Sequence, residues 1–214
     1  MSDFRIKTYP VGDIGTNCYV MYREGQKKGV IVDPGANGDY ILDMCRELSV
    51  IPEAVLLTHG HFDHIMAVDN ITEAFPGAKV YAGEHEKENL ADPAVNLTSG
   101  FGRSHTVRAD EYVKDGDVLS IAGISFQVLF TPGHTSGSVC YLIEEEGVLI
   151  SGDTLFLESL GRTDFPTGSQ PMIIRSIKER LFTLPGDTLV YPGHGNMTTI
   201  SHEKTHNPVA FYRG

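Results

Sequence analysis

The sequence predicts an α/β protein built as a four-layer αββα sandwich, in which two mixed sheets lie face to face and helices cover their outer faces. Short β-rich segments alternate with segments of helical periodicity along the 214 residues. A meander of strands in the middle of the chain follows two strand–helix units, and this order favours two sheets with outer helices. No repeat, low-complexity tract or Pro/Ser-rich linker divides the chain. We therefore expect one domain over residues 1–214.

The first half supplies strands and two helices in alternation. Apolar and β-branched runs predict strands, and positions with 3.6-residue spacing predict helices. The predicted strands are Phe4–Tyr9, Cys18–Tyr22, Val30–Val32, Ala54–Leu57 and Lys79–Tyr81, and the predicted helices are Asn37–Leu48 and Ile65–Phe75.

The pattern weakens between Gly83 and Asp115, a polar stretch too long for a simple connection. We expect some helix there and a loop near the functional site, acting as a lid over the substrate. Beyond it the predicted strands are Val118–Ile121, Ile124–Phe130, Val139–Ile143, Val148–Ile150 and Leu189–Tyr191, and the predicted helices are Met172–Phe182 and Thr199–His206.

Composition narrows the classes of function. The formal net charge is −11, a sign that disfavours nucleic acid and anionic membranes as partners and leaves a small-molecule substrate. The N-terminus shows no apolar signal segment, and no apolar run is long enough to cross a bilayer. The three cysteines, in apolar surroundings, are expected to be buried free thiols. We expect a cytoplasmic protein, and homo-oligomerisation stays open.

The densest chemical motif lies directly after the predicted strand Ala54–Leu57. It reads Thr58-His59-Gly60-His61-Phe62-Asp63-His64. In an extended segment, residues two apart point the same way, so His59 and His61 can hold one ion together. The turn into the following helix then carries Asp63 and His64 to a second position close by.

Three further ligand-type residues follow later strands, each beside glycine. They are His134 in Pro-Gly-His, Asp153 in Ser-Gly-Asp and His194 in Pro-Gly-His-Gly. Functional side chains gather on loops held by a rigid sheet, and this layout occurs four times in the chain. Five histidines and two aspartates provide three or four ligands for each of two divalent ions, with positions left for water. Imidazole and carboxylate together favour zinc, with iron or manganese as alternatives.

These motifs resemble those of the metallo-β-lactamase superfamily over nearly the whole chain. The resemblance implies that His59, His61 and His134 hold the first metal. It also implies that Asp63, His64 and His194 hold the second, and that Asp153 bridges both. Asp63 would in addition orient an attacking hydroxide.

Within the superfamily the chain is most similar to short, single-domain glyoxalase II thioester hydrolases. The likeness lies in Gly152–Phe156, Gly161–Pro166 and Pro192–Gly195. It implies that a metal-bridging hydroxide attacks a thioester such as an S-hydroxyacyl (lactoyl) glutathione. Longer members bind glutathione with a C-terminal helical domain, which we do not expect here, and their Lys and Tyr residues near the site are not matched in this sequence. Arg162 is a candidate for an anionic substrate group, and Phe62, Phe156 and Phe165 are candidate pocket walls.

Other members of the superfamily supply the alternatives. Mononuclear-iron persulfide dioxygenases share the Gly-Arg-Thr-Asp segment, although the residues flanking His194 favour the hydrolase. Lactone or phosphodiester hydrolysis on the same metals is a third hypothesis. β-Lactamases usually carry Cys where Asp153 stands and lack a ligand equivalent to Asp63, so β-lactam hydrolysis is disfavoured.

A second motif, His202-Glu203-Lys204-Thr205-His206, matches the HExxH pattern of zinc proteases. Its polar surroundings, and the proline that follows at Pro208, favour a solvated terminal helix instead.

Overall fold

The computed structural model describes residues 3–212, and two six-stranded sheets organise it. The first sheet has the order β1-β2-β3-β4-β5-β6. Its first three strands pair antiparallel, and β3 to β6 pair parallel. The bounds are β1 Phe4–Val11, β2 Thr16–Arg23, β3 Lys28–Val32, β4 Ile51–Leu56, β5 Lys79–Gly83 and β6 Glu111–Val113.

The second sheet has the order β14-β13-β10-β9-β8-β7 and is antiparallel except for the β10–β13 pair. A separate two-stranded ribbon joins β11 to β12. The bounds are β7 Val118–Ile121, β8 Ile124–Phe130, β9 Val139–Ile143, β10 Val148–Gly152, β11 Leu155–Phe156, β12 Ser159–Leu160, β13 Leu189–Pro192 and β14 Thr198–Thr199.

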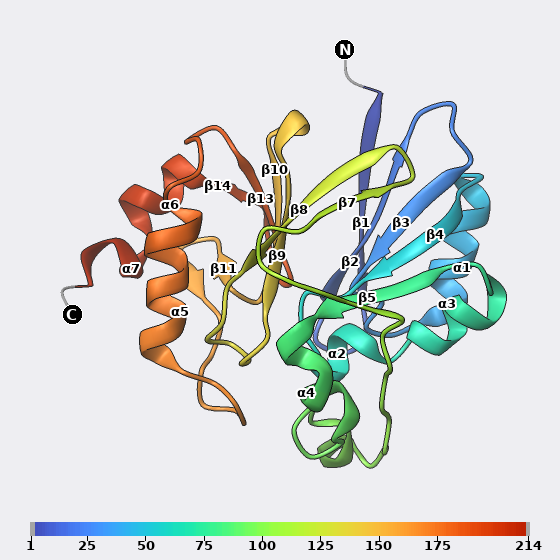
Figure 1. Cartoon of the computed structure of the whole chain (residues 1–214), viewed down its shortest axis with the longest axis horizontal. Helices are drawn as coiled ribbons and strands as arrows, with labels where there is room; N and C mark the ends of the chain where they lie inside the picture. The colour runs from blue at the N-terminus through green and yellow to red at the C-terminus, as the bar shows by residue number, and fades with distance from the viewer. Residues whose placement is uncertain (1–2, 213–214) are drawn as a thin grey trace.

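Helices cover the outer face of each sheet, so the molecule has four layers (Figure 1). The first sheet carries α1 and α3, and the second carries α5 and α6. The bounds are α1 Gly38–Glu47, α2 Phe62–Ile65, α3 Val68–Ala74, α4 Lys87–Ala91, α5 Gln170–Ser176, α6 Ile200–His206 and α7 Pro208–Phe211; α5 continues as a π-helix through Ile177–Leu181. No helix in residues 3–212 is both long enough and apolar enough to cross a membrane.

The burial pattern of β2 explains why this strand reads as a continuous apolar run. Cys18 and Val20 belong to the apolar layer under the helices, whereas Tyr19 and Met21 belong to the layer between the sheets. Successive strand residues point to opposite faces, and both faces of this sheet are covered. The predicted four-layer sandwich of two mixed sheets is therefore confirmed.

Several predicted element boundaries differ from the structure. The helix expected at Ile65–Phe75 is divided into α2 and α3, and α2 begins at Phe62, inside the histidine motif. The short strands β6, β11, β12 and β14 were not predicted, since two or three residues give no detectable alternation. The stretch from Gly83 to Asp115 contains α4 and two single-turn helices, as expected. Cys18, Cys45 and Cys140 are buried free thiols, also as expected.

Four loops that carry ligand-type residues leave the carboxyl ends of their strands at one edge of the sandwich. The strands are β4, β8, β10 and β13, which end at Leu56, Phe130, Gly152 and Pro192. The start of β2 lies at the same edge, because Asn17 N donates to Gly193 O at 2.7 Å and Tyr19 Oη donates to Pro192 O at 2.5 Å. The fold thus brings distant parts of the sequence to one place.

Candidate metal centre

The backbone of the histidine motif changes from extended to helical within a few residues. His61 has extended φ and ψ angles of −69° and 152°, and α2 starts at the next residue. Asp63 and His64 therefore lie in the first turn of a helix, while His59 and His61 lie before it. This change of conformation divides the motif between two groups of ligand atoms.

The first group consists of three imidazoles, which we call the histidine trio: His59, His61 and His134. His134 Nε2 lies 2.8 Å from His61 Nδ1 and 3.2 Å from His59 Nε2. All three side chains are at most 3% exposed. Three imidazole nitrogens that meet at a buried point have the geometry of ligands for one ion.

Hydrogen bonds orient two rings of the trio from behind. His134 Nδ1 donates to Arg162 O at 2.8 Å, so its Nε2 lone pair faces the trio. Thr58 Oγ1 donates to Asp33 Oδ2 at 2.7 Å and thus accepts from His59 Nδ1 at 3.1 Å. The His59 Nε2 lone pair consequently faces the same point.

The second group, which we call the mixed group, contains Asp63, His64 and His194. Asp63 Oδ2 lies 3.1 Å from His194 Nε2 and 3.3 Å from His64 Nε2, and it accepts from Thr16 Oγ1 at 2.8 Å. His64 is fully buried, whereas the His194 side chain is 27% exposed. The mixed group therefore lies nearer the surface than the trio.

Asp153 lies between the two groups. Its Oδ2 is 3.5 Å from His134 Nε2 and 3.6 Å from His194 Nε2, and its Oδ1 is 3.4 Å from His64 Nε2. One carboxylate thus contacts members of both groups, which is the position a bridging ligand needs.

Charge separates the trio from the mixed group. Burial lowers the pKa of all three trio imidazoles, to about 3 for His61, so they are neutral at pH 7. Burial also acts on His64 and His194, but the neighbouring carboxylates, Asp63 foremost, outweigh it and raise the pKa of both. The same imidazoles hold the pKa of Asp63 below its usual value, against the effect of burial.

Two atoms of the centre fit a bound cation better than any protein partner. Within residues 3–212, His64 Nε2 and Asp153 Oδ1 are buried and make no hydrogen bond of good geometry. Buried polar atoms without partners are rare, and a metal ion would satisfy both. Gly193 keeps the space open, since a Cβ there would lie 2.1 Å from Asp153 Oδ1. The residues therefore fit a pair of divalent ions.

Asp33 and Glu86 support this centre, although sequence reasoning did not identify either as a functional residue. Asp33 accepts hydrogen bonds from Thr58 N and Oγ1, and its Oδ2 lies 3.0 Å from His64 Nδ1. Asp33 thereby reaches His64 directly and His59 through Thr58. It follows the end of β3, as the predicted ligands follow the ends of their strands, but the adjoining Pro34-Gly35 is typical of a simple turn.

Glu86 links the two loops that carry the trio. Its carboxylate accepts from Thr135 Oγ1 and from the backbone N–H groups of Gly60 and Gly137, and it is fully buried. Gly60 lies between His59 and His61, and Thr135 follows His134. Burial raises the pKa of Glu86 to about 7, although these hydrogen bonds favour the charged form. No motif marks Glu86 in the sequence.

The three tentative substrate residues lie around the histidines. The Phe165 ring packs edge-on against His61 at 5.6 Å between centroids, and the Phe156 ring packs against His194 at 6.1 Å. Arg162 stacks its guanidinium 3.8 Å from the Phe165 centroid and pairs with Asp164 at 2.7 Å. Its charge is thus already matched by a carboxylate, whereas its carbonyl orients His134.

The HExxH segment on α6 does not form a protease site. Glu203 is fully buried and bonded to Thr198 Oγ1 at 2.6 Å and to Asn207 Nδ2 at 2.8 Å. His202 and His206 stack on each other at 4.2 Å. The expectation of a solvated helix holds for the histidines but is wrong for Glu203, which anchors α6 to its neighbours.

Comparison with known proteins places this centre in a family. The family model described as the metallo-beta-lactamase superfamily matches residues 11–194. The chain belongs to the metallo-β-lactamase superfamily. A curated relative from Bacillus subtilis, the probable metallo-hydrolase YqgX, is 41% identical over 202 residues, covering 93% of this chain and 94% of its own. The hydroxyacylglutathione hydrolase GloC of Haemophilus influenzae is 32% identical over 209 residues, covering 95% and 96%.

Solved structures agree with this assignment. The B3 metallo-beta-lactamase BLEG-1 superposes with a TM-score of 0.92 at 41% identity, covering 97% of this chain and all of its own. TTHA1623 in a di-iron-bound form superposes with a TM-score of 0.83 at 33% identity, covering 94% and 98%. Family and ligand cluster together support a metal-dependent hydrolase.

Proposed function

We propose that this chain is a dinuclear-metal hydrolase that cleaves a thioester, with an S-hydroxyacyl glutathione such as lactoylglutathione as the leading substrate. The observation that carries the proposal is the position of Asp153 between the histidine trio and the mixed group. The trio would hold one ion, the mixed group the other, and Asp153 both. The likeness to GloC supports the choice of substrate.

Two divalent ions held by these residues would lower the pKa of a water toward neutrality and polarise a carbonyl oxygen. The protein's own residues fix where this happens. The buried trio and Asp33 keep the ring nitrogens aimed at one point, and the packing around His59 and His61 excludes bulk water. The rings of Phe165 and Phe156 pack against His61 and His194.

A thioester suits this site because its leaving group needs little help. A thiol has a pKa of about 8.5, so a thiolate departs near neutral pH without a strong proton donor. The imidazoles of the centre are engaged with each other, with carboxylates or with backbone oxygens and are poorly placed to act as that donor. Zinc is the proposed metal; the di-iron form of TTHA1623 makes iron the alternative to test.

β-Lactam hydrolysis is the second candidate, because the likeness to BLEG-1 favours it. The residues Asp153 and Asp63 disfavour that activity, because β-lactamases usually carry Cys at the first position and lack a ligand at the second. A β-lactam also requires protonation of a departing nitrogen, for which this centre offers no free donor among the side chains described above.

The experiment compares metal-loaded protein on a panel of lactoylglutathione, a cephalosporin reporter, a lactone and a phosphodiester, with oxygen uptake measured on glutathione persulfide. The proposal predicts that kcat/KM is highest for the thioester. Oxygen consumption with the persulfide and no thioester cleavage would replace it with the mononuclear-iron dioxygenase. Faster cleavage of the cephalosporin, the lactone or the phosphodiester would replace it with that activity.

A further inference from the structure

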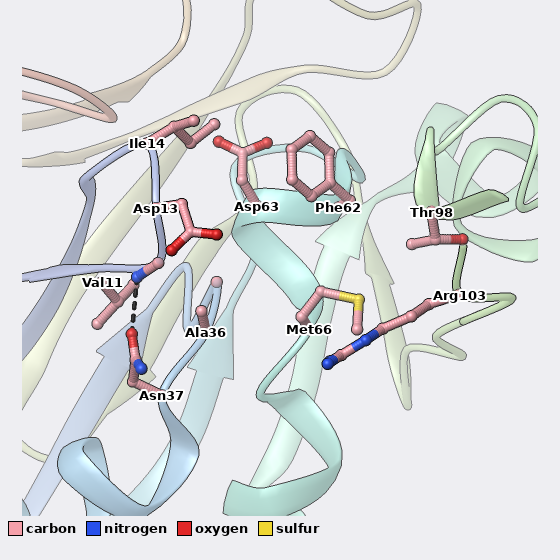
Figure 2. A pocket seen from close by; sticks show the side chains of 12 residues that line it. Val11, Asp13, Ile14, Ala36, Asn37, Phe62, Asp63, Met66, Thr98 and Arg103 are labelled. Atoms are coloured by element: carbon pink, nitrogen blue, oxygen red, sulfur yellow. Dashed lines mark hydrogen bonds between the residues drawn. The ribbon is translucent and has the colours of Figure 1, made fainter. Parts of the chain in front are cut away.

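A pocket of about 430 Å³ opens beside the mixed group, and nothing above assigns it a ligand. Its walls come from four parts of the chain that are separated in sequence: the turn Val11–Ile14, the segment Gly35–Asn37, helix α2 with Met66 just after it, and the segment that carries Thr98 and Arg103. Asp63 and Phe62 both line it (Figure 2). A molecule in this pocket therefore reaches the candidate metal centre at one end, and the volume suits part of a small substrate.

Arg103 approaches the pocket from the wall opposite the Val11–Ile14 turn and extends past Met66 (Figure 2). Most arginines in residues 3–212 form ion pairs with carboxylates; these are Arg5, Arg23, Arg46, Arg162, Arg175 and Arg180. Among those same residues, the Arg103 guanidinium has no carboxylate within 4.0 Å. In a chain of net charge −11, an unmatched guanidinium beside a pocket attracts an anionic group of a ligand in that pocket.

The segment that carries Arg103 is anchored to the metal-binding motif. Asn96, which is fully buried, accepts from Thr98 Oγ1 at 2.7 Å and donates to His105 O at 2.9 Å. Asn96 O accepts from Phe62 N at 2.8 Å, and Arg103 N donates to Thr98 O at 3.2 Å. These bonds connect the Arg103 turn to the first residue of α2, next to Asp63. The fold therefore holds the backbone of Arg103 at a defined place relative to Asp63.

The charges along the pocket give a ligand one orientation. Asp13 lies on the Val11–Ile14 turn, which is held by a 2.7 Å hydrogen bond from Gly12 N to Asn37 Oδ1. A carboxylate would be repelled near Asp13 and attracted near Arg103. Guanidinium and carboxylate match in shape and can form two parallel hydrogen bonds.

We infer that Arg103 binds a carboxylate of the substrate, and that the pocket between Arg103 and Asp63 holds the part of the thioester that joins this carboxylate to the reacting carbonyl. This inference rests on the proposed function and adds a specificity-determining residue to it. Arg103 thereby takes the role that sequence analysis considered for Arg162, whose guanidinium is already paired with Asp164.

The test uses three variants of the metal-loaded protein and two substrates. Arg103→Met removes the charge, Arg103→Lys keeps it without the planar fork, and Arg108→Met is the matched control. Arg108 is also exposed, lies five residues away, makes no ion pair within residues 3–212 and does not line this pocket. The substrates are lactoylglutathione and the same thioester with both glutathione carboxylates methylated.

The inference predicts that Arg103→Met lowers kcat/KM for the free acid at least about tenfold, mainly through KM, and changes the diester less than about twofold. Arg103→Lys should recover part of the loss, and Arg108→Met should match the wild type on both substrates. Equal losses on the acid and the diester, or no loss on either, would overturn it.

A binding measurement separates failure of this inference from failure of the proposed function. Isothermal titration calorimetry with S-methylglutathione, a thioether that cannot be hydrolysed, tests Arg103 even if the wild type cleaves no thioester. The inference is supported if S-methylglutathione binds Arg103→Met more weakly than Arg108→Met, and if this difference disappears when the carboxylates of the ligand are methylated. Equal binding to the two variants, or no binding to the wild type, contradicts it.

Discussion

The histidine trio and the mixed group lie side by side but are built differently. The trio consists of neutral imidazoles, almost fully buried, and is fixed from behind by Thr58, Arg162 O and Glu86. The mixed group pairs a carboxylate with two imidazoles of raised pKa, and it borders the pocket through Asp63. In the absence of metal, protons can balance the charge of the mixed group, whereas the trio imidazoles are neutral and contact one another. We therefore propose that the trio would provide a rigid site for one ion and the mixed group an adjustable site beside the substrate.

Removing one ligand of each group is expected to give the largest and most unequal effects. His61→Ala should lower thioester hydrolysis about 10³-fold, since losing an ion removes several kcal/mol of charge stabilisation. His194→Ala should cost less, because His194 is partly exposed and water can take its place. Metal content and kcat/KM of both variants measure this. If His194→Ala lost as much metal and kcat/KM as His61→Ala, or more, the trio would not be the more rigid of the two groups.

Asp33→Asn tests whether one carboxylate orients ligands in both the trio and the mixed group. Asp33 contacts His64 Nδ1 and, through Thr58, orients His59, so the change should weaken both ions. Residues behind metal ligands typically contribute 10–100-fold in affinity, and we expect a loss in that range at each site. Titration of metal-free protein with Zn²⁺ in the presence of a competing chelator resolves the two affinities. Loss at one site alone would show that Asp33 serves only that group.

Glu86→Gln is expected to affect the trio alone, by about tenfold in metal affinity. Glutamine presents an NH₂ group to an environment of N–H donors, so at least one link to Gly60 N, Gly137 N or Asn89 Nδ2 must break. Thr135→Val is the matched variant, because it removes one partner and leaves the carboxylate. A change in the affinity of the mixed group, with the trio unaffected, would rule out this assignment.

Lowering the pH should produce the smallest difference between the metal affinities of the trio and the mixed group. The pKa of His194 is raised, so protons compete with metal at the mixed group as the pH falls through that raised pKa. The pKa values of the trio are lowered, to about 3 for His61, so protons compete there only in stronger acid. Affinity at the mixed group should fall by up to about tenfold per pH unit below the pKa of His194, with little change at the trio down to pH 5. Cobalt spectra recorded against pH follow each ion; simultaneous release would contradict the sign of these shifts.

The fold and most of the candidate ligand residues could be predicted from the sequence, and there is a physical reason for this. Side chains that follow strand ends meet at one edge of a sandwich, and His59, His134, Asp153 and His194 all do so. Asp33 also follows a strand end, but the Pro-Gly pair after it is equally typical of a simple turn, so the pattern does not mark Asp33 as functional. The metal roles of these residues stay a prediction until an ion is measured.

Glu86 and Arg103 could not be found by the same reasoning. Each belongs to the weakly patterned region between β5 and β6, where the sequence does not specify which side chains turn inward. The burial of Glu86 depends on Gly60 and Gly137, which approach it closely from two other loops. The position of Arg103 depends on the network around Asn96. Both depend on tertiary contacts that no local pattern records.

The most direct test of a dinuclear centre is the metal content of wild-type protein purified without added metal, measured per chain by plasma mass spectrometry. The account predicts close to two ions per chain, mainly zinc or a zinc–iron mixture, and close to one ion in His61→Ala. A single iron per chain, with no second ion bound after saturation with Zn²⁺, would contradict it and favour the dioxygenase.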